Sequence, residues 1–181
     1  MSGLTTTFVL GGARSGKSTF AARLVSESGL ERVFVATATR SDDEMGERID
    51  RHRADRGDGW LTVEEPVALV EVLARHAAPG RAVLVDCLTL WLSNLMFTEG
   101  RNVERESAAL ADTVRGAKAP LVLVSNEVGL GIVPMRPLGR QFRDAQGRLN
   151  QMIAAAAPNV ALITAGLPLW LKGGGPKPRR R

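Results

Sequence analysis

The sequence predicts an α/β fold with a mostly parallel central sheet flanked by helices, and two observations lead to this prediction. Short, continuously apolar runs recur along the 181 residues, and segments with helical periodicity separate them. Apolar runs this short are typical of strands that are covered on both faces, as in a parallel sheet. Strands that alternate with helices complete the α/β pattern.

Each predicted strand ends at a glycine or a polar residue. Residues 60–64 form a weaker candidate, because their pattern of apolar and polar residues is mixed. Ligands of open α/β sheets bind beyond the carboxyl ends of the strands. We therefore expect the chemistry at the edge where Gly11, Thr37 and Asp86 follow their strands. The five stronger predicted strands span residues 7–10, 33–36, 82–85, 121–124 and 160–163.

The segments between these runs have helical patterns. Residues 18–28 predict a helix that Gly29 stops. A capping box at residues 41–44 opens a helix that runs towards His52, and Pro66 is expected in the first turn of the next helix. The other predicted helices span residues 88–97, 104–117 and 138–157.

Length and charge predict one domain, residues 1–171, followed by a flexible basic tail, residues 172–181. The tail is rich in glycine and proline, and its five basic side chains account for the net charge of +5. Removing these five from the 24 lysines and arginines leaves 19 basic against 19 acidic side chains. A neutral body with a basic tail gives weak support for polyanion binding, so we expect no nucleic-acid partner.

The lengths of the apolar runs and the number of cysteines indicate the cellular compartment in which the protein is expected. No stretch approaches the roughly 18 apolar residues of a membrane span, and residues 1–7 lack the basic cluster of a signal peptide. The single cysteine, Cys87, cannot form an internal disulfide, which fits a reducing environment. We therefore expect a cytoplasmic protein without a membrane span.

Residues 11–18 are the strongest functional signal. They match G-x-x-x-x-G-K-[ST] in full, between a predicted strand and a predicted helix. Such glycines aim backbone N–H groups at phosphate oxygens, and the positive end of the following helix adds to the attraction. Lys17 would reach the β- and γ-phosphates, and the Ser18 hydroxyl would ligate Mg²⁺. The predicted phosphate-binding residues are Gly11, Gly12, Ala13, Arg14, Ser15, Gly16, Lys17 and Ser18.

Asp86 closes a predicted strand, where nucleotide-binding proteins of this class place a carboxylate that holds Mg²⁺ directly or through water. The alternative is an acidic residue that caps the next helix. No Asn-Lys-x-Asp or Thr-Lys-x-Asp sequence follows a later strand, so no known guanine motif indicates the base.

A histidine among arginines is the second signal. Arg48, His52 and Arg56 are spaced four residues apart, so they would share one face of a helix. A neutral imidazole can attack phosphorus, and nearby arginines favour the neutral form and bind a triphosphate. The alternative is a surface histidine without a catalytic role. His76 lacks such neighbours and is expected to be an exposed residue at a helix end.

Further short motifs extend over nearly the whole chain, up to about Leu171. Together with residues 11–18 and 48–56, they resemble the bifunctional adenosylcobinamide kinase/adenosylcobinamide-phosphate guanylyltransferases of cobalamin biosynthesis. The histidine–arginine element and the two motifs nearest the C-terminus are more specific than the phosphate loop. The further motifs are Ala-Thr-Ala at 36–38, Asp-Asp-Glu-Met at 42–45, Asp-Cys-Leu-Thr at 86–89, Asn-Glu-Val-Gly-x-Gly-Ile-Val-Pro at 126–134 and Phe-Arg-Asp-x-x-Gly-x-x-Asn-Gln at 142–151.

The resemblance implies a P-loop NTPase fold of RecA-like character, a homo-oligomer and two reactions. In the first, a hydroxyl of adenosylcobinamide takes the γ-phosphate of ATP or GTP. In the second, GTP transfers GMP to a histidine with loss of pyrophosphate, and the substrate phosphate attacks that adduct to give adenosylcobinamide-GDP. The implied catalytic residues are His52, as nucleophile, and Lys17. Besides residues 11–18, the implied nucleotide site contains Ala36, Thr37, Ala38, Arg53, Ala54, Asp55, Arg56, Glu64 and Asp86, with Mg²⁺ at Ser18 and Asp86.

Two other functions stay open. One is a plain small-molecule kinase in which His52 only binds phosphate, and the other is a nucleotide-dependent switch or ATPase-like module. The missing guanine motif and the arginines around His52 count against the switch. Residues 126–134 and 142–151 are expected to face the corrinoid or another subunit, whereas Trp91 and Trp170 are expected to be packing residues.

Overall fold

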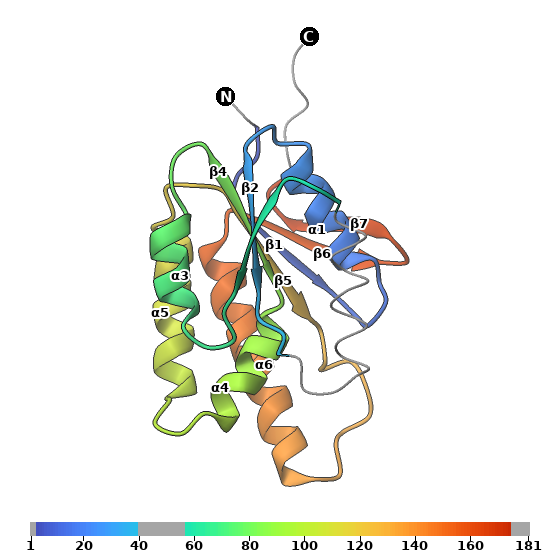
Figure 1. Ribbon diagram of the computed structural model, residues 1–181. Coiled ribbons are helices and arrows are strands. Elements are labelled where there is room, and N and C mark those ends of the chain that lie inside the picture. Colours follow the sequence, from blue (N-terminus) through green and yellow to red (C-terminus); the bar gives the residue numbers. More distant parts are fainter. Residues whose placement is uncertain (1–2, 40–56, 175–181) are drawn as a thin grey trace.

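A seven-stranded sheet in the order β3-β2-β4-β5-β1-β6-β7 organises the computed structural model (Figure 1), which describes residues 3–39 and 57–174. In this order, each pair of neighbouring strands from β3 through β6 is parallel, and β7 runs antiparallel to β6. This confirms the predicted α/β fold with a mostly parallel sheet. The strands are β1 (Thr7–Gly11), β2 (Glu31–Ala36), β3 (Trp60–Glu64), β4 (Arg81–Asp86), β5 (Leu121–Asn126), β6 (Asn159–Thr164) and β7 (Leu167–Lys172).

Alternate residues of the strands feed two hydrophobic cores, one on each face of the sheet. Phe8, Val33 and Leu121 pack with helices α3 to α6, whereas Val9 and Phe34 pack with helix α1 on the other face. The continuously apolar runs are thus explained, because both faces of the central strands are buried. The helices are α1 (Lys17–Ser26), α3 (Leu69–His76), α4 (Leu88–Phe97), α5 (Val103–Arg115) and α6 (Pro137–Ala156).

The mixed pattern of residues 60–64 is the pattern of an edge strand. β3 pairs with β2 and ends the sheet on that side, and most of its residues are exposed or half-buried. An edge strand with polar side chains resists pairing with other chains. The weaker strand prediction is therefore confirmed, and its position explains why the signal was weak.

Strand β7 was not predicted, and it extends the sheet one residue beyond the predicted domain boundary. A tight turn at Ala165 and Gly166, both with positive φ (51° and 79°), joins it to β6. Lys172 is the last residue of β7, and its ammonium group donates to the carbonyls of Ala154 and Ala155 at the end of α6. The predicted boundary after residue 171 is therefore too early, since Lys172 belongs to the sheet.

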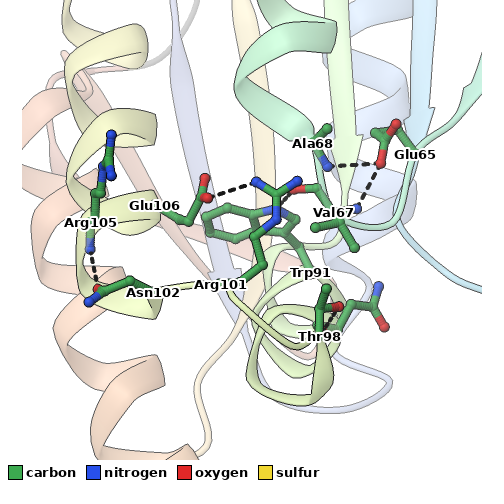
Figure 2. A network of polar contacts seen from close by, with 10 residues as sticks. Glu65, Val67, Ala68, Trp91, Thr98, Arg101, Asn102, Arg105 and Glu106 are labelled. Atoms are coloured by element: carbon green, nitrogen blue, oxygen red, sulfur yellow. Dashed lines mark hydrogen bonds and ion pairs between the residues drawn. The ribbon is translucent and has the colours of Figure 1, made fainter.

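Local hydrogen bonds set the helix ends, and one predicted start is wrong. Pro66 lies before α3, which begins only at Leu69, because the Glu65 carboxylate accepts the N–H groups of Val67 and Ala68 and closes a turn there (Figure 2). Helix α1 ends at Ser26, ahead of the predicted stop at Gly29. The remaining described helices agree with the prediction to within two residues at each end. The helix predicted from residue 41 lies outside the described residues, within which no helix has both the length and the apolar content to cross a membrane.

Trp91 is a packing residue, as predicted. It is fully buried on α4, and its indole N–H donates to the carbonyl oxygen of Val67 at 2.8 Å (Figure 2). Trp170 on β7 is half-buried and meets Phe20 of α1 edge to face, with ring centroids 6.1 Å apart. Both side chains therefore join helices to neighbouring elements.

We expect Trp91→Phe to lower the free energy of unfolding by about 2–3 kcal/mol, because it leaves a cavity and a buried carbonyl without its donor. Trp170→Phe should cost less than about 1 kcal/mol, since the half-buried ring keeps most of its contact with Phe20. Urea unfolding followed by circular dichroism measures both values. Equal losses would show that Trp91 does not anchor the core.

Candidate nucleotide-binding site

The carboxyl ends of the parallel strands bring the predicted polar residues to one edge of the sheet. In the ladder register, Ala36 at the end of β2 pairs with both Glu64 of β3 and Asp86 of β4. On the other side of β5, Gly11 at the end of β1 pairs with Asn126. The last residues of β3, β2 and β4 thus lie side by side, as do those of β5 and β1, at the edge of the sheet where ligands of open α/β sheets bind.

The phosphate loop, residues 11–18, is held by hydrogen bonds within it and by one from the β6–β7 turn. The Ser15 N–H donates to the Gly12 carbonyl at 3.3 Å, and the Gly166 N–H, from the β6–β7 turn, donates to the Ser15 carbonyl at 2.9 Å. The Lys17 ammonium group donates to the Gly12 carbonyl at 3.1 Å, and the Lys17 side chain is buried. The cation is therefore held across the loop beside its exposed tip, which is suited to an anionic ligand.

Two of the loop glycines are required by the fold itself. A Cβ on Gly11 would collide with the Ser15 hydroxyl and lie 2.7 Å from the carbonyl oxygen of Ile163. Gly16 has a φ of 91°, which favours glycine, and a Cβ there would lie 3.2 Å from the Cα of Gly166. Gly12 differs, because a Cβ at this position meets nothing within 4 Å.

We expect Gly11→Ala to destabilise the nucleotide-free protein by about 2 kcal/mol, because the added methyl group has no room. Gly12→Ala, the matched control one residue on, should change stability by less than about 0.5 kcal/mol. Urea unfolding without nucleotide or metal gives both numbers. A neutral Gly11→Ala would mean that the backbone here gives way more easily than its contacts indicate.

The oxygen atoms offered by Ser18 and Asp86 fit Mg²⁺. Ser18 lies in the first turn of α1, and Asp86, whose peptide bond to Cys87 is cis, ends β4; both are half-buried. Among the described residues, no three or more histidine, cysteine or acidic side chains gather as a metal cage. Mg²⁺ is commonly held by one or two protein oxygens together with substrate phosphates, so this sparse set of donors suits it.

Asp86 and Lys17 also act electrostatically on one buried thiol. Burial, and after it the charge of Asp86, raise the pKa of Cys87 to about 11, while the Lys17 ammonium group lowers it. A carboxylate and an ammonium group that both influence this thiol belong to one neighbourhood. This links the end of β4 to the phosphate loop.

The three residues that follow β2 differ in exposure. Ala36 and Ala38 are half-buried, whereas Thr37 is 0% exposed. The Thr37 hydroxyl donates to the Cys87 carbonyl at 2.8 Å and accepts the Cys87 N–H at 2.9 Å. Glu64, by contrast, is exposed at the end of β3.

Buried polar side chains hold the turn after β5, and of these the sequence analysis did not single out Gln146. The Asn126 N–H donates to Thr89 Oγ1 at 2.8 Å, and its carbonyl accepts from Asn150 Nδ2 at 3.1 Å. Gln146 and Asn150 both bond to Ser125. These residues connect the motif at 126–134 to the motif at 142–151, and polar residues on the apolar face of α6 were the signal that could have revealed them.

This turn leads into an exposed apolar surface. The Glu127 N–H donates to the Gly11 carbonyl at 3.2 Å, so the turn starts beside the phosphate loop. Leu130, Ile132 and Met135 then lie exposed. Met135 also lines a pocket of about 490 Å³, together with the apolar side chains of Met96, Phe97, Leu138 and Phe142. Exposed apolar patches of this kind mark surfaces that bind ligands or proteins.

Several predicted site residues stay untested. His52, Arg53, Ala54, Asp55 and Arg56 lie outside the described residues. Thr39, the last described residue before them, follows the carboxyl end of β2 at the site. His76 ends α3 as predicted but is half-buried.

The sequence matches one protein family along most of its length. A family model described as cobinamide kinase/cobinamide phosphate guanyltransferase covers residues 7–171. The bifunctional adenosylcobalamin biosynthesis protein CobP of Pseudomonas aeruginosa is 48% identical over 166 residues, which cover 91% of this chain and 96% of that protein. The corresponding protein CobU of Escherichia coli K12 is 39% identical over 178 residues, covering 91% and 98%.

Solved structures share the fold at low identity. A prototypical ATPase from a type III secretion system of pathogenic bacteria superposes with a TM-score of 0.57 at 11% identity, covering 93% of this chain and 57% of that chain. The ATPase EscN of enteropathogenic E. coli gives 0.52 at 11%, covering 90% and 43%. With the sheet described above, these likenesses confirm the predicted P-loop NTPase fold of RecA-like type.

Proposed function

This chain belongs to the cobinamide kinase/cobinamide phosphate guanyltransferase family, and from that premise we propose how its site carries out two reactions on adenosylcobinamide. The chain is a kinase and a nucleotidyltransferase of cobalamin biosynthesis. The observation that supports the proposal most directly is the Lys17 ammonium group held across the loop at residues 11–18, at the same sheet edge as Asp86. This arrangement suits a nucleoside triphosphate.

In the proposed kinase step, the terminal hydroxyl of the aminopropanol arm attacks the γ-phosphorus of ATP or GTP. The bond between that phosphorus and the β–γ bridging oxygen breaks, the nucleoside diphosphate leaves, and the hydroxyl proton is released to solvent. Lys17 and the N–H groups of the loop bind the phosphates and offset their charge. When Mg²⁺ is bound at Ser18 and Asp86, it supplies further neutralisation of phosphate charge.

In the proposed guanylyl step, an imidazole nitrogen of His52 attacks the α-phosphorus of GTP and pyrophosphate leaves. The phosphate of adenosylcobinamide phosphate then attacks the same phosphorus, the P–N bond breaks, and adenosylcobinamide-GDP forms. Arg53 and Arg56 would bind the triphosphate, and Ala36, Ala38, Ala54, Asp55 and Glu64 would line the nucleotide. The role of a histidine as a nucleophile requires its neutral form, which neighbouring arginines favour.

The surroundings of the site suit a large substrate and a second subunit. We propose that the exposed residues Leu130, Ile132 and Met135, the last of which lines the pocket near Phe97, face the corrinoid or an adjoining copy of the chain. We also propose that the protein is a cytoplasmic homo-oligomer without a nucleic-acid partner, in line with its single cysteine and its neutral body.

The test is covalent labelling. The purified protein is incubated with Mg²⁺ and GTP labelled at the α-phosphate, denatured, and examined for bound label, with α-labelled ATP as the control for the base. We expect label from GTP that is lost in acid and kept in alkali, as for a phosphoramidate. Absence of label with γ-phosphate transfer intact would contradict the guanylyl step and leave a simple kinase.

A further inference from the structure

We propose that Thr37 is a positioning residue: its buried hydroxyl fixes the backbone that presents Asp86 at the nucleotide site, and it does not contact the nucleotide itself. The expected effect on Mg²⁺ binding rests on the proposed function, in which Asp86 helps to hold the metal. Ala36 and Ala38, which are half-buried, are the residues of this segment left to line the nucleotide. The family resemblance implies that Thr37 belongs to the nucleotide site. In our proposal its side chain has a different role, which is to hold the backbone.

The Thr37 hydroxyl both donates and accepts a hydrogen bond within the protein. It donates its proton to the Cys87 carbonyl at 2.8 Å and accepts the Cys87 N–H at 2.9 Å. A threonine hydroxyl has one proton to donate, so none remains for a phosphate or a base. Thr37 is also 0% exposed, which leaves no surface for a ligand to touch.

These bonds extend the contact between β2 and β4 beyond the end of their ladder. The regular pairing ends at Ala36 and Asp86, and the Thr37 N–H then donates to the Asp86 carbonyl at 3.3 Å. Cys87 comes next and is the N-cap of α4, with no side-chain cap of its own. Because Cys87 is buried, its N–H needs an acceptor, and the Thr37 hydroxyl is the one that the structure provides.

The side chain of Asn94 also holds Thr37, through the backbone carbonyl of Thr37. Asn94 of α4 donates through Nδ2 to the carbonyl of Thr37 at 2.8 Å and to the carbonyl of Pro66 at 3.0 Å. Thr37 is therefore tied to both the start and the middle of α4. Asp86 lies between a buried strand and this fixed turn, so the direction of its carboxylate depends on the contact between Thr37 and Cys87.

Cys87 offers a direct reporter of this contact. It is the single cysteine of the chain and is 7% exposed. Because this thiol is buried, it should react slowly with an aromatic disulfide. Opening of the turn at Cys87 would expose the thiol and speed up the reaction.

The experiment compares Thr37→Val, which removes the hydroxyl at nearly constant shape, with Thr37→Ser, which keeps it. In Thr37→Val, we expect the thiol to react about tenfold faster without nucleotide or metal. The Mg²⁺ concentration at half-maximal nucleotide binding should rise about tenfold, as when a residue that orients a metal ligand is lost. Nucleotide affinity without Mg²⁺ should stay within about twofold of the unmodified protein, since the side chain makes no contact with the nucleotide. Thr37→Ser, and the control Thr62→Val at an exposed position of β3, should match the unmodified protein in all three readouts.

Several results would overturn the proposal. A loss of Mg²⁺-free nucleotide affinity in Thr37→Val with Cys87 still protected would make the hydroxyl a nucleotide ligand. Equal behaviour of the Val and Ser variants would show that the hydroxyl is not what fixes this turn. If Thr37→Val does not fold, amide hydrogen exchange of the unmodified protein decides: strong protection of the Cys87 N–H is expected, and exchange at the rate of an open amide would contradict the proposal. Thiol reactivity and Mg²⁺-free binding do not depend on GMP transfer, so failure of the labelling test would leave them interpretable.

Discussion

Replacing His52 with alanine should abolish covalent attachment of GMP to the protein while nucleotide binding by the loop at residues 11–18 persists. The reason is that alanine has no atom that can form a bond to phosphorus, whereas the phosphate loop makes its contacts without His52. We expect the yield of acid-labile label from α-labelled GTP to fall by more than about 10³-fold, as for the loss of a nucleophile. Transfer of the γ-phosphate to adenosylcobinamide should continue.

The chain contains its own control for this experiment. His76 is the second of its two histidines and ends α3. His76→Ala should keep full labelling, because His76 ends α3 shortly before the start of β4, whereas Asp86 lies at the other end of that strand. Label that survives in His52→Ala, or that is lost in His76→Ala, would contradict the assignment of His52 as the nucleophile.

Replacing Lys17 with methionine should impair both reactions. Methionine keeps the length and the apolar stem of the side chain but removes the ammonium group that the structure holds across the phosphate loop through the Gly12 carbonyl. A cation held in advance where phosphate charge develops is a large contribution to catalysis. We therefore expect kcat/KM to fall by about 10²–10³-fold for both γ-phosphate transfer and GMP transfer.

Lys172→Met is the matched control. The Lys172 ammonium group also donates to backbone carbonyls, those of Ala154 and Ala155 at the end of α6, but on the edge strand β7. Its loss should lower stability slightly and leave both reactions unchanged. Steady-state kinetics of the two variants decides the matter: normal rates in Lys17→Met would remove Lys17 from the catalytic residues.

The α/β architecture and the phosphate loop could be predicted because their signals are local. The Lys17 ammonium group bonds to a carbonyl five residues earlier, and the Ser15 N–H to one three residues earlier. A motif whose contacts lie within it needs no knowledge of the rest of the chain. The apolar strands were equally readable, because burial on both faces leaves a continuous run such as Leu121 to Val124.

Edge elements were read less well. Strand β7 was missed, since Leu167, Leu169 and Leu171 are exposed on one face and no buried run marks the strand. The start of α3 was misplaced, because Pro66 suits a first helical turn, while the Glu65 carboxylate instead closes a turn with Val67 and Ala68. For β7, no local pattern marks the strand. For α3, the hydrogen bonds of Glu65 override the local preference of Pro66 for a first helical turn.

By itself, the sequence predicted a nucleoside triphosphate site at the carboxyl edge of a parallel sheet, with Lys17 and Asp86 in it. Only the tertiary structure decided that Thr37 is buried and bonded to Cys87, which lies 50 residues further along the chain. It also decided that Gln146 and Asn150 hold the turn after β5, across separations of 21 and 25 residues from Ser125. The physical reason is that such bonds exist only after the strands have taken their order in the sheet, which brings polar groups together that no local pattern connects.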